Sequence, residues 1–136
     1  MKKILTSRKG EGYIDVVIGI FALMMVLVIS LNIFSLMTLR QDMDVICGQL
    51  IETATYEGAF NDAFDARCTE LKTRYFDFSV TASADEYYNA TYKRVQLGEV
   101  MYVTVSVQTQ VQGLGTFRIP LTVNCTRSGI SERYWK

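Results

Sequence analysis

The residues that could carry chemistry in this chain are few and widely spaced. The sequence has no histidine, which is the commonest general base and metal ligand. Its three cysteines show no C-x-x-C spacing, so we expect no metal site and no cofactor. Neither G-x-S-x-G nor S-x-x-K occurs, so no serine stands in a recognisable catalytic motif. We therefore expect no catalytic residues and a protein that is not an enzyme.

Whether the cysteines can form a disulfide depends on the cellular compartment in which the domain lies. In an oxidising environment outside the cytoplasm, Cys68 and Cys125 could form a disulfide, since both fall on the apolar side of their expected elements. Buried free thiols are the alternative, and the sequence leaves both interpretations open. Cys47 either joins the core or faces another subunit.

Asp15 is unusual because it precedes 24 residues without a charge, from Val16 to Leu39. A run of 18 or more apolar residues is typical of a transmembrane helix, and 24 residues extend about 36 Å. We therefore expect residues 13–39 to form one membrane span. An acid just inside such a helix usually has a partner, although a shallow acid can reach headgroups and water instead. Gly19, Ala22 and Ser30 share its side of the helix, and small side chains let a second helix approach closely.

The charges flanking this span predict its orientation. Residues 1–12 form a basic leader that contains Lys2, Lys3, Arg8 and Lys9, whereas only Arg40 is basic directly after the span. Basic residues close to a span stay in the cytoplasm, so we expect a single-pass protein of the cell membrane with its C-terminal domain outside. From Arg40 onward there are 10 basic and 12 acidic residues, so a polybasic nucleic-acid surface is absent and we expect no direct binding to nucleic acid.

The rest of the chain predicts a small α+β domain packed on a helical extension of the span. Residues 40–58 repeat apolar side chains at helical spacing, and residues 62–74 read as a second helix behind Asn61. Residues 59–136 then form the extracytoplasmic domain. A strand is expected over 76–82, with a further short strand near Val95 and Leu97.

The clearest β signal is a hairpin over residues 99–126. Alternate residues are apolar on both sides of a glycine-containing loop at 113–115. The apolar series is Met101, Val103, Val105, Val107 and Val111 before the loop and Phe117, Ile119, Leu121, Val123 and Cys125 after it. The fold class is therefore α+β, with a long N-terminal transmembrane and amphipathic helix packed on a small antiparallel sheet. Pro120 lacks an N–H, which predicts that its strand lies at the sheet edge.

The segment from Arg8 to Asp15 resembles the processing region of type IV prepilins. In that family a prepilin peptidase cuts after a glycine that follows basic residues, and an acid stands fifth after the cut. Here Gly10 matches the glycine, Glu11 becomes the first residue and Asp15 is fifth. The chain departs from the family in having Asp rather than Glu at that position and an acidic first residue.

As a whole the chain resembles TadE-like pseudopilins of tight-adherence pilus systems, and related small pilin-like membrane proteins of Gram-positive conjugative elements. The resemblance implies a non-enzymatic subunit of a pilus, secretion or conjugation apparatus. Its partners would be other pilin-like subunits, a prepilin peptidase and an inner-membrane assembly platform. The alternative is an unprocessed, single-pass membrane-anchored protein whose extracytoplasmic domain binds a ligand.

Overall fold

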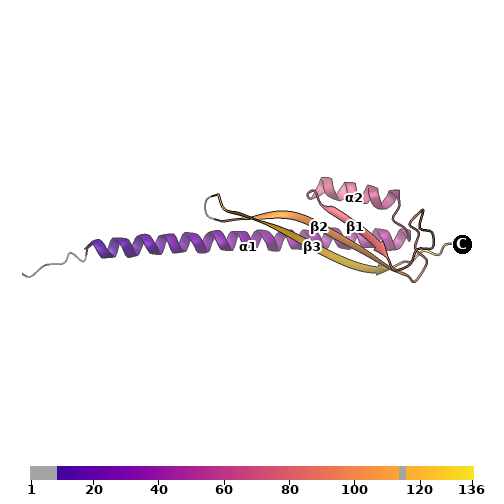
Figure 1. Cartoon of the computed structure of the whole chain (residues 1–136), viewed down its shortest axis with the longest axis horizontal. Helices are drawn as coiled ribbons and strands as arrows, with labels where there is room; N and C mark the ends of the chain where they lie inside the picture. Colours follow the sequence, from indigo (N-terminus) through magenta and orange to yellow (C-terminus); the bar gives the residue numbers. More distant parts are fainter. Residues whose placement is uncertain (1–8, 114–115) are drawn as a thin grey trace, which may run out of the picture.

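The structure is a computed structural model that describes residues 9–113 and 116–136, with the backbone alone for residues 9–11. The first eight residues of the expected leader lie outside the described residues. Two helices and three strands follow in the order α1 (Lys9–Glu57), α2 (Asp62–Arg74), β1 (Ser79–Ala84), β2 (Val100–Gln112) and β3 (Arg118–Ile130). Figure 1 shows α1 as a long rod, with α2 and the sheet gathered along its C-terminal part. The predicted α+β fold class is confirmed.

Helix α1 runs without interruption from the apolar stretch into the amphipathic one, because no proline or helix-terminating glycine lies between them. It ends at Glu57, and the next residue, Gly58, has a φ of 62°, a left-handed conformation that favours glycine. The Gly58 amide donates to the carbonyl of Ala54 at 2.8 Å. A Cβ at this position would stand 2.5 Å from the Cβ of Arg133, so packing also requires glycine there.

The three strands form one antiparallel sheet in the order β1-β2-β3. Pro120 therefore lies in an edge strand, as predicted. Strand β1 begins three residues later than expected, because Phe76 and Phe78 pack edge to face at 6.3 Å and strand pairing starts only where Ser79 meets Ser106. Strand β3 continues to Ile130, four residues beyond the expected end of the hairpin.

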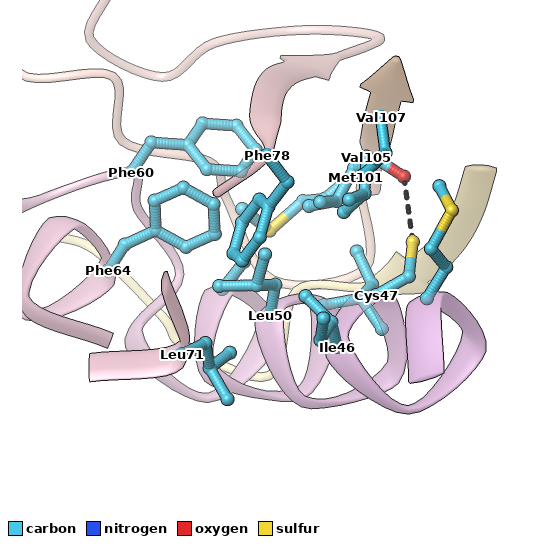
Figure 2. Packing of buried hydrophobic residues seen from close by; sticks show 14 of the residues in the cluster. Ile46, Cys47, Leu50, Phe60, Phe64, Leu71, Phe78, Met101, Val105 and Val107 are labelled. Atoms are coloured by element: carbon cyan, nitrogen blue, oxygen red, sulfur yellow. Dashed lines mark hydrogen bonds between the residues drawn. The ribbon is translucent and has the colours of Figure 1, made fainter. Parts of the chain in front are cut away.

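The core lies between the sheet and the C-terminal part of α1. The β2 residues Met101, Val103, Val105 and Val107 point toward α1 and are buried, which confirms the predicted alternation. They meet Met43, Ile46, Cys47, Leu50 and Ala54 of α1, all fully buried. Figure 2 shows Ile46 and Leu50 beneath the β2 side chains, with Phe60, Phe64 and Phe78 closing one side.

Helix α2 has the bounds that the sequence predicts. The Asn61 side chain accepts hydrogen bonds from the amides of Ala63 and Phe64 at 3.1 and 3.2 Å, which satisfies two of the free donors at the helix start. Phe64 and Leu71 are its buried residues. The expected short strand near Val95 does not form; the Val95 side chain is instead fully buried, and its amide donates to the carbonyl of Gly58 at 2.8 Å.

Candidate membrane and assembly site

The N-terminal part of α1, from Gly12 to Leu31, is left largely uncovered by the described residues. From Gly12 to Leu31 every residue except Val28 is exposed. The most apolar 18-residue window of the helix has a mean hydropathy of 2.8, and none of it is buried. The helix is thus long and apolar enough to cross a membrane. An exposed apolar surface of this extent marks contact with a membrane or with another protein.

Asp15, Gly19, Ala22 and Ser30 form one exposed stripe on this part of α1, as the sequence predicts from helical spacing. At about 100° per residue they lie within about 80° of one another and about a third of a turn from the face that packs on the sheet. The Ser30 hydroxyl donates to the carbonyl of Val26 at 2.7 Å, so its polarity is satisfied within the helix. The stripe is therefore free to meet another helix.

The expected processing residues, Gly10 and Glu11, lie near the N-terminal end of α1, which begins at Lys9. The side chain of Glu11 lies outside the described part of the structure. The residues that the sequence groups at a cleavage site and at an assembly contact thus belong to one continuous helix.

Asn32 makes a contact that the sequence analysis missed. Its side-chain amide donates to the carbonyl of Gln112 at 2.6 Å, and its side-chain oxygen accepts from the Gln112 amide at 3.3 Å. The same amide group also donates to the carbonyl of Val28 at 2.9 Å. The end of the hairpin therefore reaches a residue seven positions before Leu39, inside the stretch expected to span the membrane.

Two features of the sequence could have indicated this contact. Asn32 is the one carboxamide in the apolar stretch, and the alternation of β2 continues for 13 residues, about 40 Å of strand. A strand that starts beside the end of α1 and runs back along it passes the whole amphipathic part. The sequence does not tell where along α1 the first residue of β2 lies in space, because that position depends on the path of the loop after β1.

The cysteines are free thiols, which is the second of the two interpretations that the sequence leaves open. The possible pair, Cys68 and Cys125, is not joined: α2 packs beside α1 near β1, whereas Cys125 is on β3 at the opposite edge of the sheet (Figure 1). The neighbours of Cys125 come from α1. Its thiol donates to Asp44 Oδ1 at 3.1 Å, and the Cys47 thiol approaches the Cys125 carbonyl at 3.5 Å.

These thiols are poorly suited to nucleophilic chemistry. Burial raises the pKa of the Cys47 thiol, which donates to the carbonyl of Val103 at 3.4 Å (Figure 2). Burial, and then the hydrogen bond to Asp44, raises the pKa of Cys125 to about 12. Burial also raises the pKa of Cys68. Since the thiolate is the reactive form, the three cysteines serve the packing of the domain.

The end of the domain farthest from the apolar stretch carries a cluster of aromatic and basic side chains. The Arg94 guanidinium lies 4.4 Å from the ring centroid of Trp135 and 5.1 Å from that of Tyr92. These residues line a groove of about 340 Å³ beside the start of α2. Within the described side chains, no three His, Cys, Asp or Glu residues are grouped to hold a metal ion.

One family model matches the chain, over residues 20–136, and its description is a domain of unknown function (DUF4320). The match covers the second part of the apolar stretch and the whole domain beyond it. No curated protein and no solved structure matches the chain.

Proposed function

The chain belongs to the DUF4320 family, and we propose that it is a non-enzymatic, pilin-like subunit of a pilus, secretion or conjugation apparatus, anchored by α1 in the cell membrane. The observation that carries the proposal is the division of α1: its most apolar window is entirely exposed, while its C-terminal part covers the sheet. A helix that is half membrane span and half domain core is the architecture that the resemblance to pilins implies.

The anchored orientation follows from charge. The four basic residues before the span favour a cytoplasmic N-terminus, which leaves the domain outside. The exposed stripe of Asp15, Gly19, Ala22 and Ser30 supports contact with the helices of other pilin-like subunits. In such an assembly Asp15 would pair with the free amino group of a neighbouring, processed subunit. The other partners in this proposal are a prepilin peptidase and an inner-membrane assembly platform.

The processing step has a direct test. We would measure the intact mass of the membrane-extracted protein, expressed with and without a candidate prepilin peptidase. We expect loss of Met1–Gly10 only when the peptidase is present, and no loss in Gly10→Leu. Gly12→Leu is the matched control, because a Cβ at Gly12 meets nothing within 4 Å and the residue lies beyond the cut. A full-length mass under both conditions would refute processing.

The role of Asp15 is tested separately, by subunit association in the membrane. Asp15→Asn keeps the size of the side chain and removes its charge, so it should weaken cross-linking between processed subunits. Asp42→Asn, which lies beyond the apolar stretch, should leave cross-linking unchanged. Equal cross-linking in both variants would show that the Asp15 charge is not an assembly contact.

A second candidate function is an unprocessed membrane anchor for a binding domain. The specific observation in its favour is the groove lined by Tyr92, Arg94 and Trp135, an aromatic and basic surface held away from the apolar part of α1. A full-length mass under all conditions, together with loss of a ligand on Arg94→Ala, would favour this function over the first.

A further inference from the structure

The last residue of β2, Gln112, lies beside the apolar part of α1. The hairpin thus extends along the helix past the amphipathic part. Two hydrogen bonds between the Asn32 side chain and the Gln112 backbone fix this position. The carboxamide of Asn32 donates to the Gln112 carbonyl and accepts from the Gln112 N–H. An open groove of about 450 Å³ lies between helix and hairpin, and apolar side chains such as Met25, Ile29, Leu36 and Phe117 line most of it.

Three large apolar side chains project from this end of the hairpin. Phe117 is 65% exposed, Ile119 is 49% exposed and Leu121 is 39% exposed. Alternate residues share one face of a strand, and Ile119 and Leu121 pair with Val111 and Thr109 on the face of the sheet that carries the core valines. Farther along β3, Val123 and Cys125 on this face are partly covered, because β3 there lies against α1. The apolar face of β3 is thus least covered where it approaches the span.

The length of the span determines what surrounds this surface. The hydrocarbon core of a bilayer is about 30 Å thick and needs about 20 helical residues. Twenty residues counted from Val16 end at Ser35, so Asn32 lies about 4.5 Å inside the outer boundary of that core. A hairpin end that is hydrogen-bonded to Asn32 must then lie at the level of the headgroups and the upper acyl chains.

We propose that Phe117, Ile119 and Leu121 form a second membrane contact, in which these three side chains insert shallowly into the outer leaflet beside α1. The ligand is the interface of a phospholipid bilayer. The exposed Arg118 between these residues is placed to reach lipid phosphates, as long basic side chains do at membrane interfaces. This inference rests on the proposed function only in that α1 must span the membrane.

The backbone limits the depth of insertion. The outer edge of β3 is unpaired in the described structure, and open strand edges do not occur in the hydrocarbon region because their N–H and C=O groups would lack partners. Pro120 lowers this cost by removing one N–H from the strand between Ile119 and Leu121. At the boundary between acyl chains and headgroups, the apolar side chains can contact acyl chains while the unpaired N–H and C=O groups of β3 bond to water and headgroups.

The test uses the full chain in phosphatidylcholine–phosphatidylglycerol vesicles that carry lipids with nitroxide quenchers at known depths. Tryptophan is placed at the hairpin end (Phe117→Trp), on the same strand about 23 Å away (Asn124→Trp), and in the span (Leu27→Trp). The emission of the unsubstituted protein, which contains Trp135, is subtracted. Trp135 lies beside the C-terminal end of α1, where its indole N–H donates to the carbonyl of Gly58 at 3.2 Å.

We expect shallow quenchers to reduce the emission of Phe117→Trp at least threefold more than that of Asn124→Trp, and deep quenchers to act on Leu27→Trp. Quenching of Leu27→Trp without quenching of Phe117→Trp would overturn this inference and leave the span intact. Loss of both would overturn the membrane proposal as well. Blue-shifted emission of Phe117→Trp that no lipid quenches, and that grows with the protein-to-lipid ratio, would show a second copy of the chain at this surface.

Discussion

The two parts of α1 belong to one uninterrupted helix, yet they face different surroundings. Before Asn32 the helix is apolar on all sides and exposed, whereas from Met43 to Ala54 it is apolar on one side and buried there. A helix that is apolar all round needs a surrounding apolar medium or other helices, and a helix with one apolar stripe needs only a sheet. The comparison shows that one continuous helix can carry an exposed, wholly apolar part and a packed, amphipathic part without a break.

The largest expected difference between the two parts concerns the stability of the domain. Leu50 is fully buried against β2 and α2, while Leu23 is 63% exposed. Leu50→Ala removes core contacts and should lower the free energy of unfolding by about 2–5 kcal/mol. Leu23→Ala should change it by less than about 0.5 kcal/mol. Urea unfolding of the full chain in mild detergent, followed by circular dichroism, measures both; equal losses would contradict the division of α1.

An arginine placed at an exposed position in each part of α1 tests directly whether the surroundings of the two parts differ. Leu27 and Val45 are 55% and 46% exposed. An arginine near the centre of a membrane helix costs about 2.5–3.5 kcal/mol on insertion scales. Leu27→Arg should therefore lower the fraction of protein that floats with membranes, while Val45→Arg should not. If the two variants float equally well, the first part of α1 is not surrounded by lipid.

Sequence patterns predicted the parts of the fold that follow a local period. The bounds of α2 follow from the Asn61 cap, and the buried face of β2 follows from alternation through Val107. The contacts between distant elements were not predictable, because periodicity gives a face but not a neighbour. Cys125 shows this: its place on the apolar face of β3 was expected, but its neighbours proved to be Asp44 and Cys47 of α1 and not Cys68.

The candidate site also has one part that the sequence predicts and one part that it does not. The stripe from Asp15 to Ser30 could be read from spacing alone, since it lies on one helix. The approach of the hairpin to Asn32 depends on how strand length and helix length compare over the whole domain. The strand rises about 3.3 Å per residue and the helix about 1.5 Å, so a 13-residue strand passes more than 20 helical residues.

Substitutions at two glycines are expected to change the free energy of unfolding by smaller amounts and in opposite directions. A Cβ on Gly129 of β3 would stand 2.6 Å from Thr55 Cγ2 and 3.0 Å from Ile51 Cγ1 on α1. Gly129→Ala should push β3 from the helix and cost about 1–3 kcal/mol of unfolding free energy. A Cβ on Gly48, within the same helix, meets nothing within 4 Å, so Gly48→Ala should stabilise by about 0.5–1 kcal/mol. Thermal unfolding of both variants should move in opposite directions; a shift of the same sign would place β3 elsewhere.

The last expected effect is a loss of stability at alkaline pH that depends on the contact between Cys125 of β3 and Asp44 of α1. Because burial and Asp44 raise the pKa of Cys125 from 9.0 to about 12, the folded state keeps its thiol proton at a pH where the unfolded state has lost it. The unfolded state then binds fewer protons, so the free energy of unfolding falls as pH rises above 9 and continues to fall until about 12.

Cys125→Ser keeps a hydroxyl donor for Asp44 and does not titrate in this range, so its free energy of unfolding should depend less steeply on pH than that of the unsubstituted protein. Urea unfolding between pH 8 and pH 11 measures the difference between the two proteins, in which the titration of every other group cancels. Parallel pH curves would show that the Cys125 thiol is not held between Asp44 and the core. A steeper fall in the unsubstituted protein would tie the alkaline sensitivity of the domain to the contact between α1 and β3, the contact that the exposed part of the helix lacks.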